Sequence, residues 1–352
     1  MGTPQLTTYI KNQGYSGVNI QLKDMKSKTI AIDFSIWAYK ANYARSTDNP
    51  HPMYAYFIKM IKNFIINEIK FIFVFDGTPP PLKKDTILSR DDQTNKYKEQ
   101  FTKLKAEYEL IVVGDDDIMR KINITNEMHK LNVKINIAPR KEEITYMKDL
   151  FTLMNIPHIT IDEHDAEAFC GYLNKMGYID YVLTSDSDGL IFGCNNIVYD
   201  YKHNDSTLRI KYLYHVLDLL KFPIDGTGLT KLINFAYCCG TDYNKHIYKR
   251  RIANDHCSII NSKNFGFDVI INNIKKSFKI EDVQTVYDNY LKIYDAFTFD
   301  YSKLFNDISP FDFSKKDFGN FVEGIRSSIK LLKDNDLLKN LSIEAVYLIK
   351  NI

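Results

Sequence analysis

Short apolar runs that end at or near an aspartate recur along the chain. The runs TIAID and FIFVFD have the length and composition of buried strands, and they end at Asp33 and Asp76. A third run, IDYVL, leads into a loop that contains Asp186 and Asp188. Parallel strands of an open α/β sheet end at one edge, and ligands bind at that edge. We therefore expect these carboxylates to gather there.

Apolar residues at three- and four-residue spacing alternate with these strands and predict helices. The segment MYAYFIKMIKNFIINEIK is typical of a core helix with lysines on its outer side. The segment DAEAFCGYLNKMG predicts a helix that carries Asp165 and Glu167 at its start. Two alternating runs after it, NNIVYDYK and LRIKYLY, predict short strands, and an apolar helix then ends at Gly240 with Asp242 just beyond. This alternation predicts an α/β fold with a mainly parallel central sheet flanked by helices.

A highly charged segment, 91–141, separates the second strand from the next sheet element. Its interspersed charges of both signs predict an inserted helical pair. The acidic run 115–117 is interpreted as a loop and not as a metal site, because no strand leads into it. Just before the segment, Lys83 and Arg90 lie about two helical turns apart. Both are expected on one helix face, where two cations beside a carboxylate-rich edge suit a phosphate.

The composition is typical of an intracellular protein with a large core. The chain has 352 residues and is 45% hydrophobic. A net charge of +2 excludes no class of partner, because clustered carboxylates can mask basic residues elsewhere. The five cysteines show no CxxC pair and no secreted disulfide pattern, and the sequence has neither a signal peptide nor a bilayer-spanning run. We expect a soluble intracellular protein that is not secreted and has no membrane partner.

Two acidic doublets stand close together in the middle of the chain, Asp165 with Glu167 and Asp186 with Asp188. Carboxylates brought together repel one another unless a cation lies between them, and hard oxygen ligands suit Mg²⁺ or Mn²⁺. Each doublet taken alone is more typical of a helix cap or a solvated turn. The acids at the other strand ends favour the metal site.

The acidic residues at strand and helix ends number seven: Asp33, Asp76, Asp165, Glu167, Asp186, Asp188 and Asp242. Their order and the residues around them resemble the flap endonuclease family, the XPG-type structure-specific 5′ nucleases. The matching blocks are TIAIDFSIWAY, VFDGTPPPLK, IPHITIDEHDAEA, TSDSDGLIFG and GTDY. Five blocks in the same order are far more specific than any single motif. The resemblance covers roughly 1–244, with a fainter echo near 318–332.

The resemblance implies a PIN-like 5′-nuclease fold and a Mg²⁺-dependent phosphodiester hydrolase. Two Mg²⁺ ions would activate a water and stabilise the leaving oxygen, with Mn²⁺ as a substitute. The seven acids would divide between the ions, with Asp33, Asp76, Asp165 and Glu167 around one and Asp186, Asp188 and Asp242 around the other. The nuclease core would span 1–244 with a helical arch inserted at about 83–141.

Further site residues follow from the same resemblance. Lys83 and Arg90 match the basic pair at the foot of the family's arch and would grip the scissile phosphate. Tyr39 matches an aromatic residue on which the family stacks a base, and burial in the core is an equally good interpretation of that ring. Gly2 matches a small residue beside the site. The arch would pass a single-stranded 5′ end.

The carboxy-terminal region, 245–352, departs from the family and is expected to be a divergent, helical DNA-binding region. The Gly-rich turn that in the family binds duplex phosphates, often with K⁺, is missing, which leaves a bound K⁺ in doubt. Basic residues would hold the duplex instead, namely Lys245, Lys249, Arg250 and Arg251. The tail motif that holds a sliding clamp is also absent, so clamp tethering is not expected.

These inferences predict a monomeric Mg²⁺-dependent 5′-flap endonuclease and 5′→3′ exonuclease that cuts branched or flapped DNA in replication or repair. It would act in the nucleus or, for a viral protein, at a cytoplasmic replication site. Alternatives are a relative specialised for bubbles, four-way junctions or RNA 5′ ends, and a DNA-binding scaffold that does not cut. The DSDG sequence at 186–189 also occurs in aspartyl-phosphate phosphatases, but that class requires Thr or Val where Leu190 stands.

Overall fold

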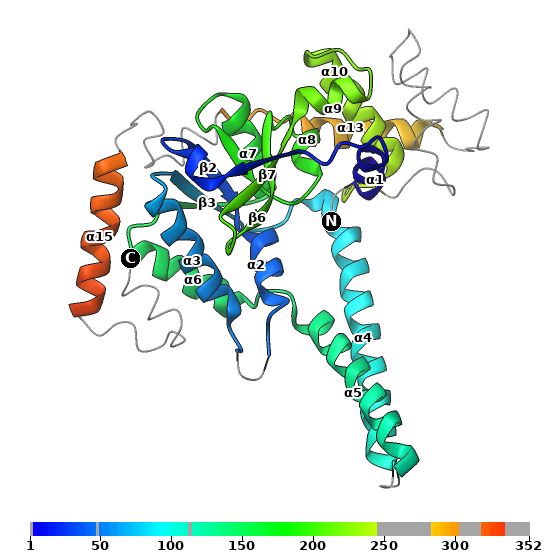
Figure 1. Cartoon of the computed structure of the whole chain (residues 1–352). Helices are drawn as coiled ribbons and strands as arrows, with labels where there is room; N and C mark the ends of the chain where they lie inside the picture. The colour runs from blue at the N-terminus through cyan, green and yellow to red at the C-terminus, as the bar shows by residue number, and fades with distance from the viewer. Residues whose placement is uncertain (1–2, 47–48, 112–114, 245–282, 303–317, 335–352) are drawn as a thin grey trace.

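The fold is built on one seven-stranded sheet (Figure 1). The computed structural model describes residues 3–46, 49–111, 115–244, 283–302 and 318–334. The strands lie in the order β1-β7-β6-β5-β2-β3-β4. Their bounds are Val18–Gln21 for β1, Thr29–Asp33 for β2, Lys70–Asp76 for β3, His158–Ile161 for β4, Tyr181–Leu183 for β5, Asn196–Lys202 for β6 and Thr207–Tyr212 for β7.

The strands from β6 to β4 run parallel, and β2 lies in the middle of them between β5 and β3. All but the first residue of β2 and all but the last residue of β3 are buried, which is typical of parallel strands covered on both faces. Asp33 pairs in register with Val74, so Asp33 and Asp76 reach the same edge of the sheet. The prediction of an α/β fold with a mainly parallel central sheet is confirmed.

Helices cover both faces of the sheet, and each face has its own hydrophobic core. In β2, Ile30 and Ile32 belong to one core and Ala31 to the other, as the alternation of a strand requires. The first core is closed by α2 (Phe34–Asn42), α3 (Pro52–Ile66), α6 (Lys141–Leu153) and α15 (Phe318–Asp334), with the short helix η1 (Leu22–Met25) beside them. The second is closed by α1 (Pro4–Asn12), α7 (Ala166–Lys175), α8 (Asp188–Ile191), α9 (Leu213–Leu219), α10 (Gly226–Cys239) and α13 (Val283–Phe297).

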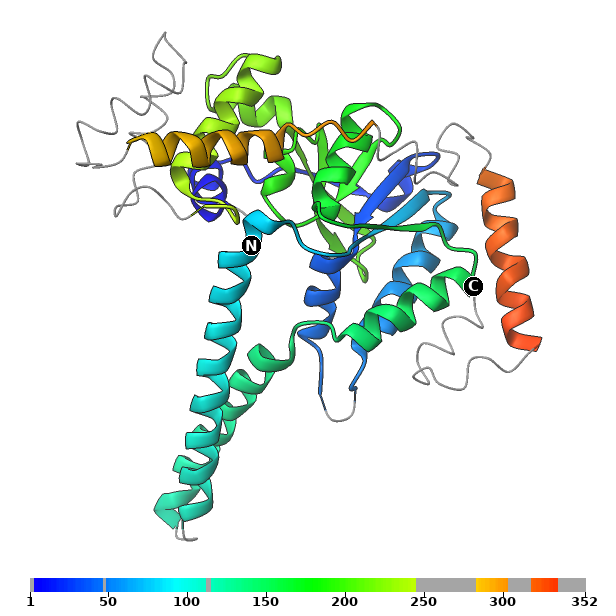
Figure 2. The same cartoon turned by 180° about the vertical axis from the view of Figure 1, so that it is seen from behind.

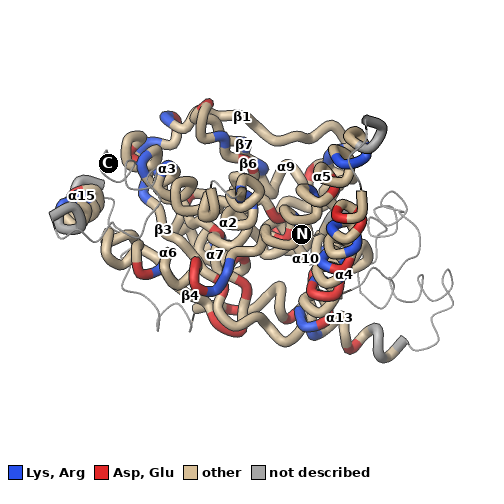
Figure 3. The backbone as a smooth tube through the Cα atoms, turned by 90° about the horizontal axis from the view of Figure 1, so that it is seen from below, with Lys and Arg blue, Asp and Glu red and all other residues tan. Residues whose placement is uncertain are grey.

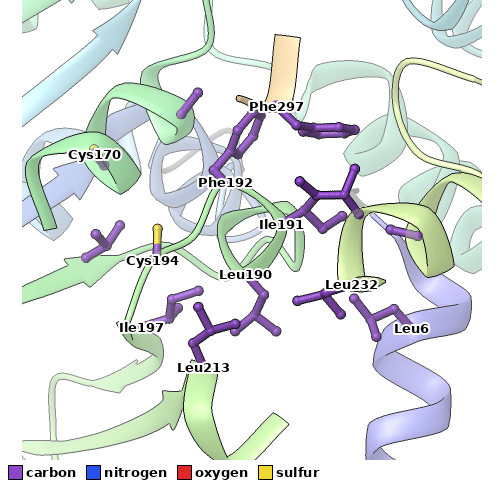
Figure 4. Packing of buried hydrophobic residues seen from close by; sticks show 14 of the residues in the cluster. Leu6, Cys170, Leu190, Ile191, Phe192, Cys194, Ile197, Leu213, Leu232 and Phe297 are labelled. Carbon is purple, nitrogen blue, oxygen red and sulfur yellow. The ribbon is translucent and has the colours of Figure 1, made fainter. Parts of the chain in front are cut away.

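The two cores differ in the side chains that fill them. Stacked phenylalanines fill the first core, with ring centroids 4.5 Å apart for Phe34 and Phe57 and 4.4 Å apart for Phe73 and Phe151. Such pairs contribute about 0.5–1.5 kcal/mol beyond their buried area. Mainly aliphatic side chains and buried thiols fill the second core around α8 (Figure 4). Both cores hold the strand ends, and with them the acidic edge, rigidly in place.

A helical hairpin stands away from the sheet (Figures 1 and 2). The short helix η2 (Pro81–Lys83) leads into α4 (Lys84–Leu110), and α5 (Asp115–Asn136) returns alongside it. None of the residues of α4, all of which the structure describes, is buried. Basic and acidic residues alternate along the hairpin when it is seen end on (Figure 3). A helix pair this exposed depends on its own contacts and on whatever binds to it, and not on the core.

The structure differs from the sequence-based prediction in two elements, the start of α5 and the edge strand β1. The acidic run 115–117 was expected in a loop, but α5 begins at Asp115. Acidic residues are favoured in the first turn of a helix, where they face the positive end of its dipole. The edge strand β1 was not predicted at all, because only Val18 and Ile20 are apolar there and most of the strand is exposed. Among the described helices, none is long and apolar enough to cross a membrane.

Candidate metal and phosphate site

Two of the predicted acids lie at neighbouring strand ends. Asp33 is the last residue of β2, is 6% exposed, and accepts a hydrogen bond from the Thr184 hydroxyl at 3.2 Å. Asp76 is the last residue of β3 and accepts the backbone N–H of Ala166 at 3.0 Å. This second bond fastens the start of α7 to the end of β3, so that the next two acids are placed against the first two.

The start of α7 contributes Asp165 and Glu167. Asp165 precedes the first helical residue, but its side chain caps no N–H of the helix. Its carboxylate accepts a hydrogen bond from the Tyr243 hydroxyl and forms an ion pair with Lys83, with a distance of 2.7 Å. Glu167 is buried and accepts the backbone N–H of Gly189 at 2.8 Å. Both carboxylates therefore face the edge of the sheet.

The loop after β5 and the first residue of α8 contribute Asp186 and Asp188. Thr184 fixes the loop, because its hydroxyl oxygen accepts the Asp186 N–H at 3.2 Å. Asp188 is 3% exposed and accepts the Thr3 hydroxyl at 2.7 Å. The Thr3 backbone N–H also donates to Ser187 Oγ at 2.8 Å. The beginning of the chain is thus fastened to the second acidic doublet.

Two basic side chains on one flank of the site pair with two of the acids. Lys83 Nζ lies 2.7 Å from Asp165 Oδ1, and Arg90 Nη2 lies 2.6 Å from Asp242 Oδ2. Thr86, on the turn of α4 between them, donates its hydroxyl to the Asp242 backbone carbonyl at 2.6 Å. Lys83 and Arg90 therefore both turn toward the carboxylate edge, from the base of the helical hairpin.

The acids of the site lie close enough to perturb one another. Burial raises the pKa of Asp33 well above its ordinary value, and the charges of Asp76 and Asp186 raise it further. Burial likewise raises the pKa of Glu167 and of Asp188, and Asp186 adds to both shifts. A group of carboxylates that resist ionisation next to one another is a place where added positive charge is strongly stabilising.

Lys83 supplies part of that positive charge. Burial alone would lower the pKa of its ammonium group, but the charges of Asp165, Asp242 and Asp188 outweigh burial and raise it. Burial raises the pKa of Asp165 to about 6 even though Lys83 opposes the shift. The single positive charge of Lys83 therefore does not neutralise the acidic cluster.

The chemistry of the donor set fits a hard divalent cation, since the edge offers buried carboxylate oxygens in excess over cations. The side chains are not yet arranged as a closed ligand set. Within the described parts of the chain, no three His, Cys, Asp or Glu side chains are placed to hold one ion. Lys83 and Arg90 occupy Asp165 and Asp242 instead. A bound cation and these basic groups would compete for the same oxygens.

The remaining predicted residues are placed differently. Tyr39 is partly buried on α2, where burial raises its pKa and the charge of Arg90 lowers it, so its ring lies near the same site. Gly2 lies outside the described residues, as do the four basic residues predicted to hold duplex DNA, Lys245, Lys249, Arg250 and Arg251. Three contacts were missed from the sequence, those of Thr3, Thr184 and Tyr243. The last two stand inside the motif blocks TSDSD and GTDY, which was the available signal.

Known proteins are similar to this chain in sequence and in fold. This chain is 27% identical to a probable RAD2-like endonuclease of Invertebrate iridescent virus 6 over 291 residues, which cover 71% of the chain and 68% of the relative. Over 340 residues, 92% of the chain and 88% of the relative, it is 27% identical to flap endonuclease 1 of Methanococcus aeolicus. The catalytic core of Rad2 in complex with a DNA substrate superposes with a TM-score of 0.58 at 20% identity, covering 94% of this chain and 98% of that one. A eukaryotic GEN-1 junction-resolving enzyme binding potassium superposes with a TM-score of 0.54 at 16% identity, covering 94% and 71%.

The mainly parallel sheet, whose carboxyl edge gathers acids and two basic side chains, has the fold of these solved nuclease structures. Two family models narrow this class. The XPG N-terminal domain matches residues 1–97 and the XPG I-region matches residues 155–242. The chain belongs to the XPG family of structure-specific nucleases, whose members are metal-dependent, and the resemblance found in the sequence is confirmed.

Proposed function

We propose that the protein is a Mg²⁺-dependent 5′-flap endonuclease and 5′→3′ exonuclease that hydrolyses DNA by a two-metal mechanism. The observation that carries the proposal is the pairing of both basic side chains, Lys83 and Arg90, with acids of the cluster. Cations at the base of an exposed hairpin and acids at the sheet edge form one continuous site. Such a site suits a phosphodiester that enters under the hairpin.

The acids would bind two Mg²⁺ ions, which supply an activated water and charge stabilisation of the leaving oxygen. Asp33, Asp76, Asp165 and Glu167 would hold one ion and Asp186, Asp188 and Asp242 the other. Mn²⁺ would substitute for Mg²⁺, since both prefer oxygen ligands. The hydrogen bonds of Thr184 and Thr3 to these acids keep them oriented when the charges change.

Lys83 and Arg90 would exchange partners during the reaction. Each is paired with a carboxylate in this structure. Where that carboxylate holds a divalent ion, the basic group would be free to turn toward the scissile phosphate. Arg90 is 46% exposed in its side chain and Lys83 is 20% exposed, so Arg90 is the freer of the two to meet incoming DNA. Tyr39, whose pKa responds to burial and to the charges of Arg90 and Asp76, would stack on the base next to the cut.

The hairpin of α4 and α5 would be the arch over a single-stranded 5′ end, and residues 245–352 would be the divergent DNA-binding region. Lys245, Lys249, Arg250 and Arg251 would hold the phosphates of the duplex. A protein that works this way would act as a monomer in DNA replication or repair, in the nucleus or at a viral replication site. DNA complexes of Rad2 among the similar structures support DNA as the substrate.

The test is a cleavage panel. The purified protein would be incubated with a 5′-labelled double-flap DNA, with Mg²⁺ or with EDTA, beside bubble, four-way junction, single-stranded and RNA-flap substrates. Mg²⁺-dependent cutting at the base of the DNA flap is the expected result. Asp188→Ala, which removes one predicted ligand, serves as the inactive control and should still bind the DNA.

The other outcomes separate the alternatives. If only a junction, a bubble or an RNA end were cut, the nuclease assignment would stand and the flap assignment would fail. If every substrate were bound and none cut, with Mg²⁺ or with Mn²⁺, the acids would have to serve a scaffold and the enzyme assignment would fail.

A further inference from the structure

A tyrosine that no part of the predicted site includes lies between its basic and acidic halves. Tyr243 follows Asp242 in the loop after α10, and its hydroxyl donates a hydrogen bond to Asp165 Oδ2. The other oxygen of that carboxylate pairs with Lys83. Lys83 Nζ in turn lies 5.2 Å from the centre of the Tyr243 ring. One aromatic side chain therefore contacts both members of the ion pair.

The loop that carries Tyr243 is itself well fixed. The backbone N–H of Tyr243 donates to the Thr241 hydroxyl at 3.1 Å, and Thr241 exchanges backbone hydrogen bonds with Asn244. Gly240 opens the turn with a φ of 87°, a conformation that side chains other than glycine rarely adopt. These hydrogen bonds fix the backbone of the loop that carries the ring.

Residues from much later in the chain support the ring from behind. Phe297, the last residue of α13, meets the Tyr243 ring edge to face at 5.1 Å. It also contacts the Phe192 ring, with the ring centroids 5.1 Å apart (Figure 4). The helix α13 is held on α10 by a buried hydrogen bond of 2.6 Å from the Tyr290 hydroxyl to Asn234 Oδ1. The support behind Tyr243 is therefore rigid.

The same late segment also packs on the loop that carries Asp165. Tyr301 is 3% exposed, and its ring lies 5.2 Å from His164 and 5.9 Å from Phe169 of α7. His164 is next to Asp165 in the chain, and the Phe299 ring also packs on it, with the ring centroids 4.2 Å apart. Residues 297–301 thus pack beside Asp165 in two places, on the Tyr243 ring and on the ring of its chain neighbour His164.

We propose that Tyr243 is a positioning residue, which holds Asp165 and Lys83 in fixed relative places, and that residues 297–301 act as its backing. The proposal rests on the proposed function in that Asp165 is taken as a metal ligand. A tyrosine hydroxyl can keep its bond to Asp165 when Lys83 leaves for a phosphate. The carboxylate would then stay in place during the exchange.

The experiment compares Tyr243→Phe with the matched control Tyr290→Phe. Both changes remove one hydroxyl from a hydrogen-bonded tyrosine, but only the first touches the site. In EDTA, backbone amide exchange of residues 166–169 is measured by mass spectrometry. In a second assay, Mn²⁺ binding is measured by electron paramagnetic resonance of the free ion. Neither readout requires cleavage.

Tyr243→Phe is expected to speed exchange at the start of α7 on the order of tenfold, since a hydrogen bond to a charged group is lost. It should weaken Mn²⁺ binding on the order of tenfold to a hundredfold, as loss of a residue that orients a ligand does. Tyr290→Phe should change neither. Phe297→Leu, which keeps the hydroxyl but loosens its support, should give a smaller change in the same direction.

Unchanged exchange and unchanged Mn²⁺ binding in Tyr243→Phe would overturn the proposal. Equal changes in Tyr243→Phe and Tyr290→Phe would also overturn it, because the effect would then be general loosening. If the wild-type protein bound Mn²⁺ and Tyr243→Phe weakened that binding, the positioning role would stand even if no DNA were cut. Failure of the proposed function and failure of this inference are therefore distinguishable.

Discussion

Replacing Lys83 by Met tests the electrostatics of the site without changing its packing greatly. Lys83 and Asp165 form an ion pair whose side chains are 20% and 7% exposed. Removing the ammonium leaves Asp165 as a buried carboxyl without its cation. In the metal-free variant, the Asp165 carboxyl would then be protonated in the folded state.

The size of the effect follows from the pKa of Asp165, which is about 6 in the folded protein against an ordinary value of 3.8. At pH 7.5 that rise already costs the wild-type protein about 3 kcal/mol, at 1.36 kcal/mol per pKa unit. A variant that folds only with the proton bound would pay about 5 kcal/mol at the same pH, by the same conversion. Lys83→Met should therefore lose at most about 2 kcal/mol of stability through Asp165 at pH 7.5.

The sign of the pH dependence is fixed by the same reasoning. A carboxyl whose folded pKa is raised binds more protons in the folded than in the unfolded chain, so the penalty shrinks as pH falls toward 3.8. At pH 6 the wild-type carboxyl is already about half protonated, and the difference between variant and wild type should fall below about 0.5 kcal/mol.

The assay is urea unfolding in EDTA at pH 6 and pH 7.5, followed by the single tryptophan, Trp37, which is buried in α2. Arg90→Ala is the control, because its ion pair is 46% exposed on the arginine side and should contribute at most about 1 kcal/mol at either pH. Equal destabilisation of Lys83→Met at both pH values would refute the reasoning.

Three further predictions concern other parts of the molecule. Asp188→Asn should abolish cleavage and leave DNA binding largely intact, and in EDTA it should raise the unfolding temperature, because a carboxylate with a raised pKa is replaced by a neutral group; an unchanged cleavage rate would contradict its role. His203→Phe should make the protein less sensitive to acid. Burial lowers the pKa of His203 to about 3, so between about pH 6.5 and pH 3 only the unfolded chain binds the proton. In urea titrations, the free energy of unfolding of the variant should gain about 2 kcal/mol relative to wild type on going from pH 6.5 to pH 4.5. Phe151→Ala should lower stability by about 3–5 kcal/mol while the folded fraction keeps its cleavage rate, since Phe151 is fully buried and stacks on Phe73 within the first core. A loss under about 1 kcal/mol in calorimetry would show that neighbouring side chains refill the cavity.

The strands and their acids were predictable because the signal was local. In TIAID and FIFVFD, a continuous apolar run indicates a strand buried on both faces, and the acid that ends the run is placed at the sheet edge by the direction of the strand alone. The position of Asp165 at the start of a helix was equally local. That these acids bind metal stays a prediction.

The partners of the basic residues were not predictable in the same way. Helical spacing indicated that Lys83 and Arg90 share a face, but not that Lys83 meets Asp165 or that Arg90 meets Asp242, because those pairs join segments far apart in the chain. The strand β1 was not predicted from the sequence for a related reason. Its residues carry little apolar signal, and it exists because β7 offers an edge to pair with.

The hydrogen bond from Thr3 to Asp188 spans 185 positions of the chain, and the site is closed only when Asp242 and Tyr243 have joined it. A nascent chain that has left the ribosome only as far as α8 would hold several acids but neither the Arg90 pairing nor the Tyr243 bond. Cleavage competence would then arrive late in synthesis, and a chain broken between these segments would lose it. The dispersion of these residues along the chain would keep an incomplete nuclease from cutting DNA.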